Sequence, residues 1–511
     1  MFASVLSSVI VGLDVCPVQV EADVSDGLPG FIMVGFPSVQ VKEAQDRVRT
    51  AMHNSGFRLP PKKVTVNLTP ADIRKEGAGF DLPVAAAILA AGHFLPTEGL
   101  SQIMIYGELG LDGEIHAATG ILPRLLKARE LGCSFCIIPR QNMAEALLVP
   151  DIRVCGVSSL SEMAACIFDP EQFFSSQTVP EGMPAAGLSN DSPVDFSDIH
   201  GQTRARRAAE IAAAGFHNLL MIGPPGSGKT MIARRISTIL PQLTFEEQLE
   251  LTKIYSIAGL LSEKMPLVNE RPFRAPHHTC SPVSLAGGGR IPKPGEVTLA
   301  HLGVLFLDEM PEFGRHSLEV LRQPLEDRSI LISRVGASCM FPADFMLIAA
   351  MNPCPCGFYP DLSRCRCTHG AVSHYLGKIS QPLLDRMDLC TEVGQISLGQ
   401  MRSTKPGESS AEIRARVCAA RQIQQERYAH EEFRCNGQLR GRLVEKYCRT
   451  DDEAQALLDK AYETLSFSAR SYHRILKAAR TIADLEASEL IHKEHMAEAL
   501  TYRAFDKRYW E

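Results

Sequence analysis

The sequence lacks a net basic charge, a long apolar run and an internal repeat. Its 511 residues carry a formal net charge of −6, so no overall positive field attracts nucleic acid. Nucleic-acid binding would therefore have to come from local basic patches or from a pore in an assembly. No apolar run reaches the roughly 18–20 residues that span a bilayer, so we expect no membrane segment. Residues 1–15 are apolar without the basic region of a secretory signal, and we expect them to form a strand.

The composition that is present is ordinary for a globular protein of several domains. The chain is 45% hydrophobic and 22% charged, and its length suits roughly two to four domains. Two polar stretches without an apolar period predict linkers, one at 175–195 and one near 399–410. The expected plan is an N-terminal domain at 1–174, the linker at 175–195, a central domain at 196–398 and a C-terminal part at 399–511.

The C-terminal part has apolar residues at a helical spacing. This pattern predicts a bundle of helices that follows the central domain as a lid. The predicted helices span 411–428, 452–465, 469–485 and 493–502.

The strongest motif of the chain is GPPGSGKT at 223–230. It matches the G-x-x-x-x-G-K-[ST] loop, in which glycines let backbone N–H groups approach nucleotide phosphates closely. An apolar strand is expected before it at 218–222 and a helix after it at 231–240, which is the context the motif requires. Lys229 would contact the β- and γ-phosphates, and the Thr230 hydroxyl would ligate Mg²⁺. The predicted nucleotide-binding residues of this loop are Gly223, Pro224, Pro225, Gly226, Ser227, Gly228, Lys229 and Thr230.

A second motif, VLFLDE at 304–309, supplies the acidic partner of that loop. Four apolar residues predict a buried strand that ends in two carboxylates. Asp308 would hold Mg²⁺ through its water shell, and Glu309 would orient and polarise the attacking water. Because both motifs occur in order and in context, we predict that the chain binds ATP with Mg²⁺ and hydrolyses it.

Three further residues complete the predicted catalytic set with Glu309. Asn352 follows an apolar strand at 345–350 and has the place of a γ-phosphate sensor, although an Asn in a turn before a proline is an alternative. Arg386, in PLLDR, resembles a finger that reaches the ATP of a neighbouring subunit. Arg470 opens a C-terminal helix where a second sensor would lie. Either arginine could instead be an ordinary surface residue.

The order of these motifs resembles an AAA+ ATPase of the magnesium-chelatase-like group. The residues DIHGQ at 198–202 resemble the box that brackets adenine in such proteins. More specifically, RPFRAPHHT at 271–279, the stretch at 294–313 and MNPCPCG at 351–357 resemble the ComM/YifB family. This resemblance covers essentially the whole chain. It implies an AAA+ α/β core with a helical lid, and a hexameric ring that acts as a DNA helicase in branch migration, during recombination or natural transformation.

The region between the two nucleotide motifs is longer than a minimal core needs. Basic residues and glycines there would suit contacts with a DNA strand in the pore that the resemblance implies. Packing at a subunit interface or against nucleotide is the alternative for these side chains. The candidate DNA contacts are Arg271, Arg274, Arg290 and Lys293.

Four cysteines after the sensor strand form a C-x-C…C-x-C pattern. A nucleotide-hydrolysing enzyme is expected in the reducing cytoplasm, where its 15 cysteines would stay free of disulfides. Four thiolates suit a tetrahedral structural Zn²⁺ site, with His369 and His374 as spare ligands, and four reduced thiols in a loop are the alternative. The predicted zinc ligands are Cys354, Cys356, Cys365 and Cys367.

The N-terminal domain resembles the proteolytic domain of Lon, in the segments 64–89 and 105–139. This resemblance implies an S5-type α+β fold. Lon-type peptidases pair a Ser nucleophile with a Lys base. Those positions fall here on Gly79 and Leu122, neither of which can perform its role, so we expect a fold without the catalytic dyad.

Three functions are weighed for the whole chain. A homo-oligomeric DNA translocase of the ComM type fits all the motifs. A protein-remodelling ATPase threads polypeptide with similar machinery and stays open. A chelatase motor subunit is disfavoured, because such motors lack an S5-like domain and this cysteine cluster.

Overall fold

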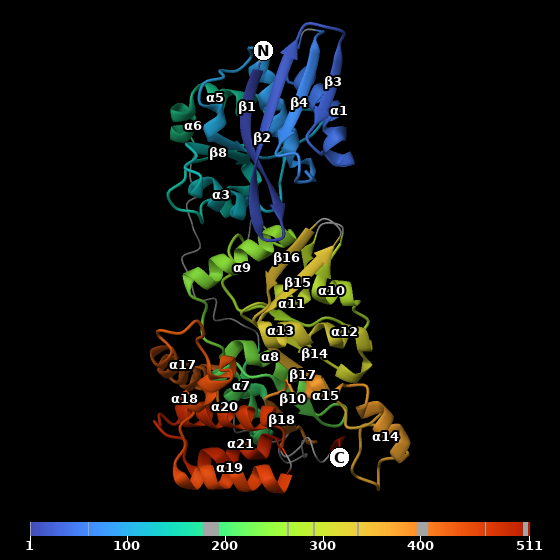
Figure 1. The fold of residues 1–511 in the computed structure, drawn as a ribbon, viewed down its shortest axis with the longest axis vertical. Coiled ribbons are helices and arrows are strands. Elements are labelled where there is room, and N and C mark those ends of the chain that lie inside the picture. Colours follow the sequence, from blue (N-terminus) through green and yellow to red (C-terminus); the bar gives the residue numbers. More distant parts are fainter. Residues whose placement is uncertain are drawn as a thin grey trace.

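The computed structural model describes residues 2–59, 61–176, 194–262, 265–289, 292–334, 337–395, 407–465, 467–503 and 509–510. The N-terminal domain lies at one end of the long axis of the molecule, and toward the other end the C-terminal helices lie beside the central domain (Figure 1). Most of the predicted linker at 175–195 lies outside the described residues, and so does most of the second polar stretch. No helix in the described ranges is both apolar enough and long enough to cross a membrane.

The N-terminal domain is built on a mixed sheet of seven strands in the order β3-β4-β2-β1-β5-β8-β9. β1 and β2 form a long antiparallel hairpin, and β2 also pairs antiparallel with β4. The remaining neighbours are parallel. The strands are β1 (Phe2–Val11), β2 (Asp14–Ser25), β3 (Gly30–Val34), β4 (Lys63–Thr69), β5 (Ile103–Ile105), β8 (Phe135–Pro139) and β9 (Val154–Val157), with a separate pair β6 (Glu108–Leu109) and β7 (Ile115–His116).

Helix α2 (Asp81–Ala91) is the centre of this domain. Every one of its residues is buried, because it packs on β1, β2 and α1 (Val39–Asn54). An apolar, alanine-rich sequence is what such an all-round burial requires. The other helices are α3 (Ile121–Glu130), α4 (Met143–Ala146), α5 (Leu160–Phe168) and α6 (Pro170–Ser176). The mixed α/β architecture agrees with expectation, and the more specific likeness to the S5/Lon fold stays a prediction.

The central domain contains a parallel five-stranded sheet in the order β11-β14-β17-β10-β18. Its inner strands β10, β14 and β17 are buried at every position, as expected for a parallel sheet covered by helices on both faces. The predicted α/β core with a parallel sheet is therefore confirmed. The strands are β10 (Leu219–Ile222), β11 (Phe273–Arg274), β14 (Val304–Leu307), β17 (Met346–Met351) and β18 (Leu389–Glu392).

Helices and two hairpins complete the central domain. One hairpin joins β12 (Gly287–Gly288) to β13 (Lys293–Pro294), and the other joins β15 (Ser329–Arg334) to β16 (Ala337–Pro342). The helices are α7 (Thr203–Gly215), α8 (Lys229–Ile239), α9 (Phe245–Ala258), α10 (Pro282–Ala286), α11 (Glu296–Leu299), α12 (Arg315–Val320), α13 (Arg322–Asp327), α14 (His369–Leu376) and α15 (Gln381–Leu384).

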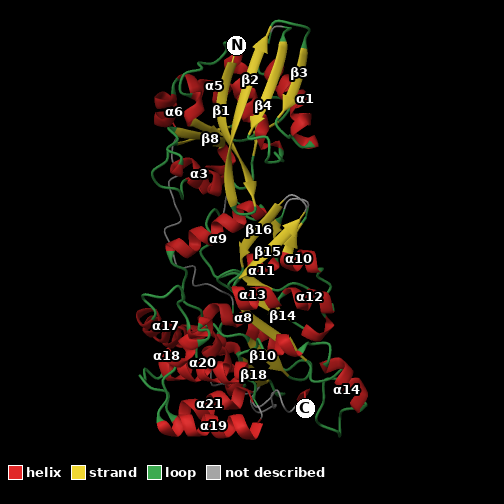
Figure 2. Cartoon of the chain, in the orientation of Figure 1, coloured by secondary structure: helices red, strands yellow, loops and turns green. Residues whose placement is uncertain are grey.

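The C-terminal region is helical throughout its described part (Figure 2). Its first helix starts with a capping box, in which Ser409 and Glu412 each bond the other's backbone N–H. α17 and α20 pack against α7 of the central domain. The helices are α17 (Ser410–Arg427), α18 (Arg442–Tyr447), α19 (Asp452–Leu465), α20 (Ala469–Leu485) and α21 (Lys493–Arg503).

The N-terminal domain contacts the central domain at two places. At the first, α3 packs on α9, and the Gly120 N–H donates to the Ser256 carbonyl at 3.1 Å. At the second, the turn of the β1–β2 hairpin meets the β15–β16 hairpin (Figure 1). A methyl group on Gly12 would lie only 2.8 Å from Cys339 Cβ, so the backbone at Gly12 packs directly against the side chain of Cys339.

Candidate nucleotide site

The phosphate loop lies between β10 and α8, in the predicted context. Gly226 and Gly228 have φ angles of 73° and 95°, which favour glycine. A Cβ on Gly223 would collide with the Val393 carbonyl oxygen, so this position needs glycine for close approach. The loop leads directly into the N-terminus of α8, where anions are favoured.

Lys229 is buried at the start of α8 and is held by three oxygens. Its Nζ donates to the carbonyls of Gly223 at 2.7 Å and Pro224 at 2.9 Å, and to Asn352 Oδ1 at 3.2 Å. Burial lowers the pKa of Lys229 to about 8. The predicted sensor Asn352 therefore lies within hydrogen-bond reach of the lysine predicted to bind phosphate.

Thr230 and Asp308 form the expected pair for a magnesium ion. The Thr230 hydroxyl donates to Asp308 Oδ2 at 2.7 Å, although the residues are 78 positions apart in sequence. Both oxygens are hard ligands of the kind that Mg²⁺ prefers. The two residues would bind the ion between the loop and the end of β14, directly and through water.

Glu309 has a strained backbone next to this pair. Its φ is 51°, in the left-handed region that few side chains adopt, and its N–H donates to Asp308 Oδ1 at 3.0 Å. The carboxylate is 58% exposed, and Oε2 lies 3.5 Å from His278 Nδ1. The ring of His278 stacks near that of His277, with centroids 4.0 Å apart. An exposed, positioned carboxylate is what the activation of water requires.

His278 is the residue that sequence reasoning placed incompletely. It lies in the 271–279 stretch that carries the family resemblance, and the structure brings its Nδ1 to 3.5 Å from Oε2 of Glu309, the predicted water-activating residue. A signal was present, because the HHT stretch belongs to a family motif, but its partner Glu309 follows β14 and is distant in sequence.

The DIHGQ box packs on the phosphate loop. Gln202, with a φ of 51°, donates from Nε2 to the Ser227 carbonyl at 3.2 Å and to the Gly394 carbonyl at 2.6 Å. Asp198 forms an ion pair with Arg235 of α8 at 2.7 Å. These contacts place the box beside the phosphate loop, as a role at the adenine would require.

The two predicted arginines are placed differently from the rest of the site. The Arg386 guanidinium is buried and pairs with Glu326 at 2.6 Å, and it also donates to the Pro382 carbonyl at 2.5 Å. Arg470 is exposed at the second position of α20. Within the described residues, the hydrogen bonds around Lys229 and Asp308 include neither of them. Their roles as finger and second sensor stay predictions that need a second subunit or a movement of the lid.

The four DNA candidates divide in the structure. The side chain of Arg271 is only 13% exposed. It donates to the carbonyls of Pro241 at 2.6 Å and Leu302 at 2.7 Å and so links these two loops. Arg274 forms a bidentate pair with Glu296 at 2.7 and 2.8 Å. Lys293 is exposed on β13, and Arg290 lies outside the described residues. Arg271 and Arg274 are thus engaged within the chain, and their role as DNA contacts stays a prediction.

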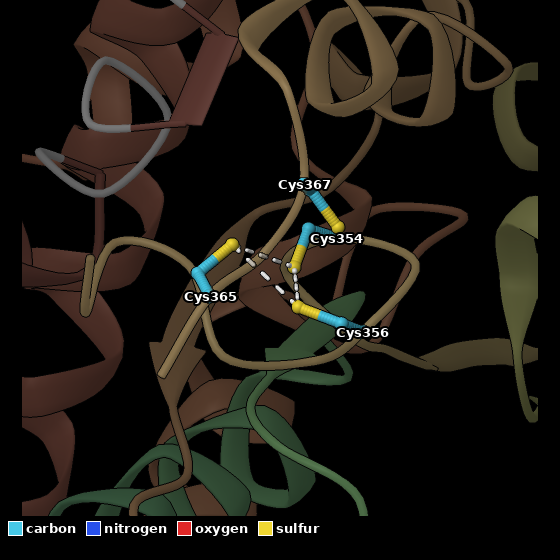
Figure 3. A group of neighbouring side chains, drawn as sticks. All are labelled: Cys354, Cys356, Cys365 and Cys367. Carbon is cyan, nitrogen blue, oxygen red and sulfur yellow. Dashed lines mark hydrogen bonds between the residues drawn. The ribbon is translucent and has the colours of Figure 1, made fainter. Parts of the chain in front are cut away.

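The four predicted zinc ligands lie together after β17 (Figure 3). The sulfur atoms of Cys354, Cys356, Cys365 and Cys367 all lie within 4.8 Å of one another. His369 and His374 are exposed on α14 and do not belong to this group.

The positions in the N-terminal domain that correspond to a peptidase dyad are filled. A Cβ on Gly79 would collide with the ring of Tyr106, and Leu122 is fully buried. The Arg124 guanidinium lies 3.5 Å over the Tyr106 ring and donates to Ser8 Oγ at 2.8 Å. The aromatic ring occupies the space that a nucleophile would need, which agrees with a domain lacking the dyad.

Comparisons with known proteins identify the family. The magnesium chelatase subunit ChlI model matches residues 195–401, the model for subunit ChlI of Mg-chelatase matches 20–142, and the ChlI C-terminal model matches 407–503. With its parallel sheet and phosphate loop, the chain is an AAA+ protein of the magnesium-chelatase type.

Similarity over nearly the full length narrows this class. The chain is 44% identical to competence protein ComM of Haemophilus influenzae, over 98% of this chain and 97% of that protein. It is 42% identical to the uncharacterized protein YifB of Escherichia coli, over 97% and 96%. The magnesium-chelatase 67 kDa subunit of Chlorobaculum parvum matches only 31% of this chain, at 27% identity. The chain belongs to the ComM/YifB family.

Proposed function

We propose that this protein is an ATP-driven DNA translocase of the ComM type, which promotes branch migration as a hexameric ring. The observation that carries the proposal is the assembled cluster of Lys229, Thr230, Asp308, Glu309 and Asn352. Its support for a DNA substrate is the near full-length similarity to a competence protein. The same proposal places the protein in the cytoplasm and gives it a role in recombination or natural transformation.

The chemistry is phosphoryl transfer to water. Lys229 would exchange its carbonyl partners for phosphate oxygens, which are stronger acceptors for a charged donor. Bound Mg²⁺, held by Thr230 and Asp308, would neutralise charge on the phosphates. Glu309 is positioned to accept a proton from the attacking water, and Asn352 to orient the γ-phosphate next to Lys229.

Arg386 would supply the remaining positive charge to a neighbouring subunit. Because its guanidinium is paired with Glu326 at 2.6 Å within one chain, this role requires the pair to open on assembly. We expect Arg386→Ala to abolish turnover and to leave ATP binding intact. Mixing Arg386→Ala subunits with Lys229→Ala subunits should restore part of the turnover, because each supplies what the other lacks. Loss of ATP binding in Arg386→Ala would contradict the role.

DNA contact is assigned to Lys293, which is exposed on the β12–β13 hairpin. Arg290, which lies outside the described residues, remains a candidate with it. Neutralising one phosphate contact lowers the salt dependence of binding by about one counterion. Lys293→Ala should therefore weaken DNA binding and flatten its salt dependence, whereas Lys460→Ala, an exposed lysine of α19, should change neither.

The deciding experiment is the ATPase rate of the full-length protein with and without forked or four-way DNA, using Glu309→Gln as a blank. Strong stimulation by DNA that is absent from the blank supports the proposal, and strand-exchange assays follow. A rate that ignores DNA would overturn it in favour of protein remodelling, and a polypeptide substrate would then be sought.

A further inference from the structure

The cysteine cluster has the dimensions of a metal site. Cys354 Sγ lies 3.3 Å from Cys356 Sγ and 3.8 Å from Cys365 Sγ, and the latter two are 3.5 Å apart. A Zn–S distance of about 2.3 Å in a tetrahedron separates sulfurs by about 3.8 Å. A disulfide needs about 2.05 Å, so these sulfurs are at ligand spacing and not at bonding distance. We propose that the four cysteines bind one structural zinc ion and that this site braces the phosphate loop.

The segment that carries the cysteines needs a constraint of this kind. Between the end of β17 and the start of α14, residues 352–368 form no helix and no strand. Irregular loops longer than about 12–15 residues are uncommon in compact domains unless they are functional. The segment is nevertheless compact, since the Tyr359 N–H donates to Cys354 Sγ at 3.4 Å and the Cys365 N–H to the Asp361 carbonyl at 2.8 Å. A metal that joins both cysteine pairs would close this loop.

The same loop touches the phosphate loop directly. Gly357 has a φ of 84°, and a Cβ there would collide with Pro225 Cδ and lie 3.0 Å from Cγ. Pro225 is the third residue of GPPGSGKT. At the other end of the segment, Asn352 accepts a hydrogen bond from Lys229 at 3.2 Å, two residues before Cys354. The cysteine loop therefore reaches the nucleotide site at two points, one backbone contact and one side chain.

Tyr509 and Trp510 also pack near the cysteine loop. The ring of Tyr359 lies 6.3 Å from that of Tyr509, and Trp510 Nε1 donates to the Leu376 carbonyl at 3.3 Å. Tyr509 and Trp510 join the same apolar cluster as Tyr359 and all four cysteines. The loop is thus held by this apolar cluster as well as by Pro225.

The chemistry of binding is simple. Each thiol that ligates gives its proton to the buffer as the Zn–S bond forms, with no change of oxidation state. Four protein ligands leave no open position, so the ion would be structural and not catalytic. Because zinc would bind this arrangement and not the unfolded loop, it would stabilise the position of Gly357 against Pro225.

The first test is metal content. Full-length protein, produced with zinc in the medium and purified with a reductant, should contain about one zinc per chain by mass spectrometry of the elements. Cys356→Ser and Cys365→Ser should lose it, while Cys418→Ser, at an exposed cysteine of α17, should keep it. Cys365→His offers zinc another accepted ligand and should retain metal, which would show that the serine variants lose zinc for lack of a ligand and not through misfolding. Absence of zinc, with all four thiols free to alkylate, would overturn the site.

The second test asks whether the cysteine loop supports the phosphate loop, separately from whether it binds zinc. Only this part of the proposal rests on the proposed ATPase function. In the Glu309→Gln background, removal of zinc by a chelator should weaken binding of a fluorescent ATP analogue about tenfold, and added zinc should restore it. Gly357→Ala should keep zinc but weaken the same binding, because the added methyl displaces Pro225. Unchanged binding in both would overturn the brace. A protein that contains zinc but never binds nucleotide would instead refute the ATPase function.

Discussion

The N-terminal and central domains contain similar local sequences that serve opposite purposes. Each has a glycine-containing turn that leads into a helix, at GPPGSGKT before α8 and at 77–80 before α2. In the central domain the glycines leave room for phosphate, and the side chains that follow converge on that space. In the N-terminal domain the ring of Tyr106 fills the space at Gly79, and Arg124 covers the ring.

The difference shows that a glycine turn alone carries no chemistry. Lys229, Thr230, Asp308 and Asn352 bond one another with groups that a nucleotide can replace. Glu145, the buried acid of the N-terminal domain, instead accepts from the Leu122 N–H at 2.8 Å and from the Ser256 hydroxyl across the domain boundary. Its partners are structural, so burial here serves packing.

The largest effect is expected from Lys229→Ala, which tests the difference between the glycine turns of the two domains. Removing the charged donor of the phosphate loop should lower the ATPase rate by about 10³-fold, in the range for preorganised charge at a transition state. Nucleotide binding should also weaken. The measurement is steady-state turnover together with equilibrium binding, and Lys460→Ala is the control. Turnover within about threefold of the original protein would show that another group holds the phosphates.

Gly79→Ala tests the filled site of the N-terminal domain. The added methyl meets the Tyr106 ring, so the free energy of unfolding should fall by about 1–3 kcal/mol, as for other overpacked cores. Chemical denaturation measures this change. Gly370→Ala, in α14 where a Cβ meets nothing within 4 Å, should be neutral or stabilising. A neutral Gly79→Ala would mean that the ring moves easily and that the space is available.

The pH dependence of ATP binding tests the burial of Lys229. Its pKa of about 8 is below its ordinary value, so the free protein loses this proton as pH rises through 8. Bound phosphate favours the charged form, and binding above pH 8 must therefore take up a proton. Affinity should be constant below pH 8 and fall by up to about tenfold per pH unit above it. A flat profile from pH 7 to 9.5 would contradict the low pKa.

Glu145→Gln should have the smallest effect. Burial raises the pKa of Glu145, so its folded form binds a proton more readily than its unfolded form, and stability falls as pH rises through this range. A neutral amide should therefore change the free energy of unfolding at pH 7 by less than about 1 kcal/mol. ATPase activity should stay within about twofold. A strong loss of activity would show that Glu145 has a role in function and not only in packing.

The elements with local signals were predictable. The helices at 452–465 and 469–485 have the predicted bounds, because their amphipathic period and flanking polar residues are encoded locally. The approach of Thr230 to Asp308 followed from motif order, since the strands that precede them end at one edge of a parallel sheet.

What could not be predicted depends on partners distant in sequence. Arg271 reads as an available charge until the carbonyls of Pro241 and Leu302 are placed around it. The pairing of Arg386 with Glu326 and the approach of His278 to Glu309 have the same origin. A sequence gives the type and spacing of charges, but tertiary packing decides which are already satisfied.

The contact of Gly12 with Cys339 has a mechanical consequence. β1 runs from this joint for 10 residues, about 33 Å, and forms the middle of the N-terminal sheet. The hairpin on the other side of the joint, β15–β16, follows α13 and leads into the sensor strand β17. A tilt of about 3–5° at this contact would displace the far end of β1 by about 2–3 Å, so small rearrangements near the nucleotide site would be magnified at the opposite end of the molecule.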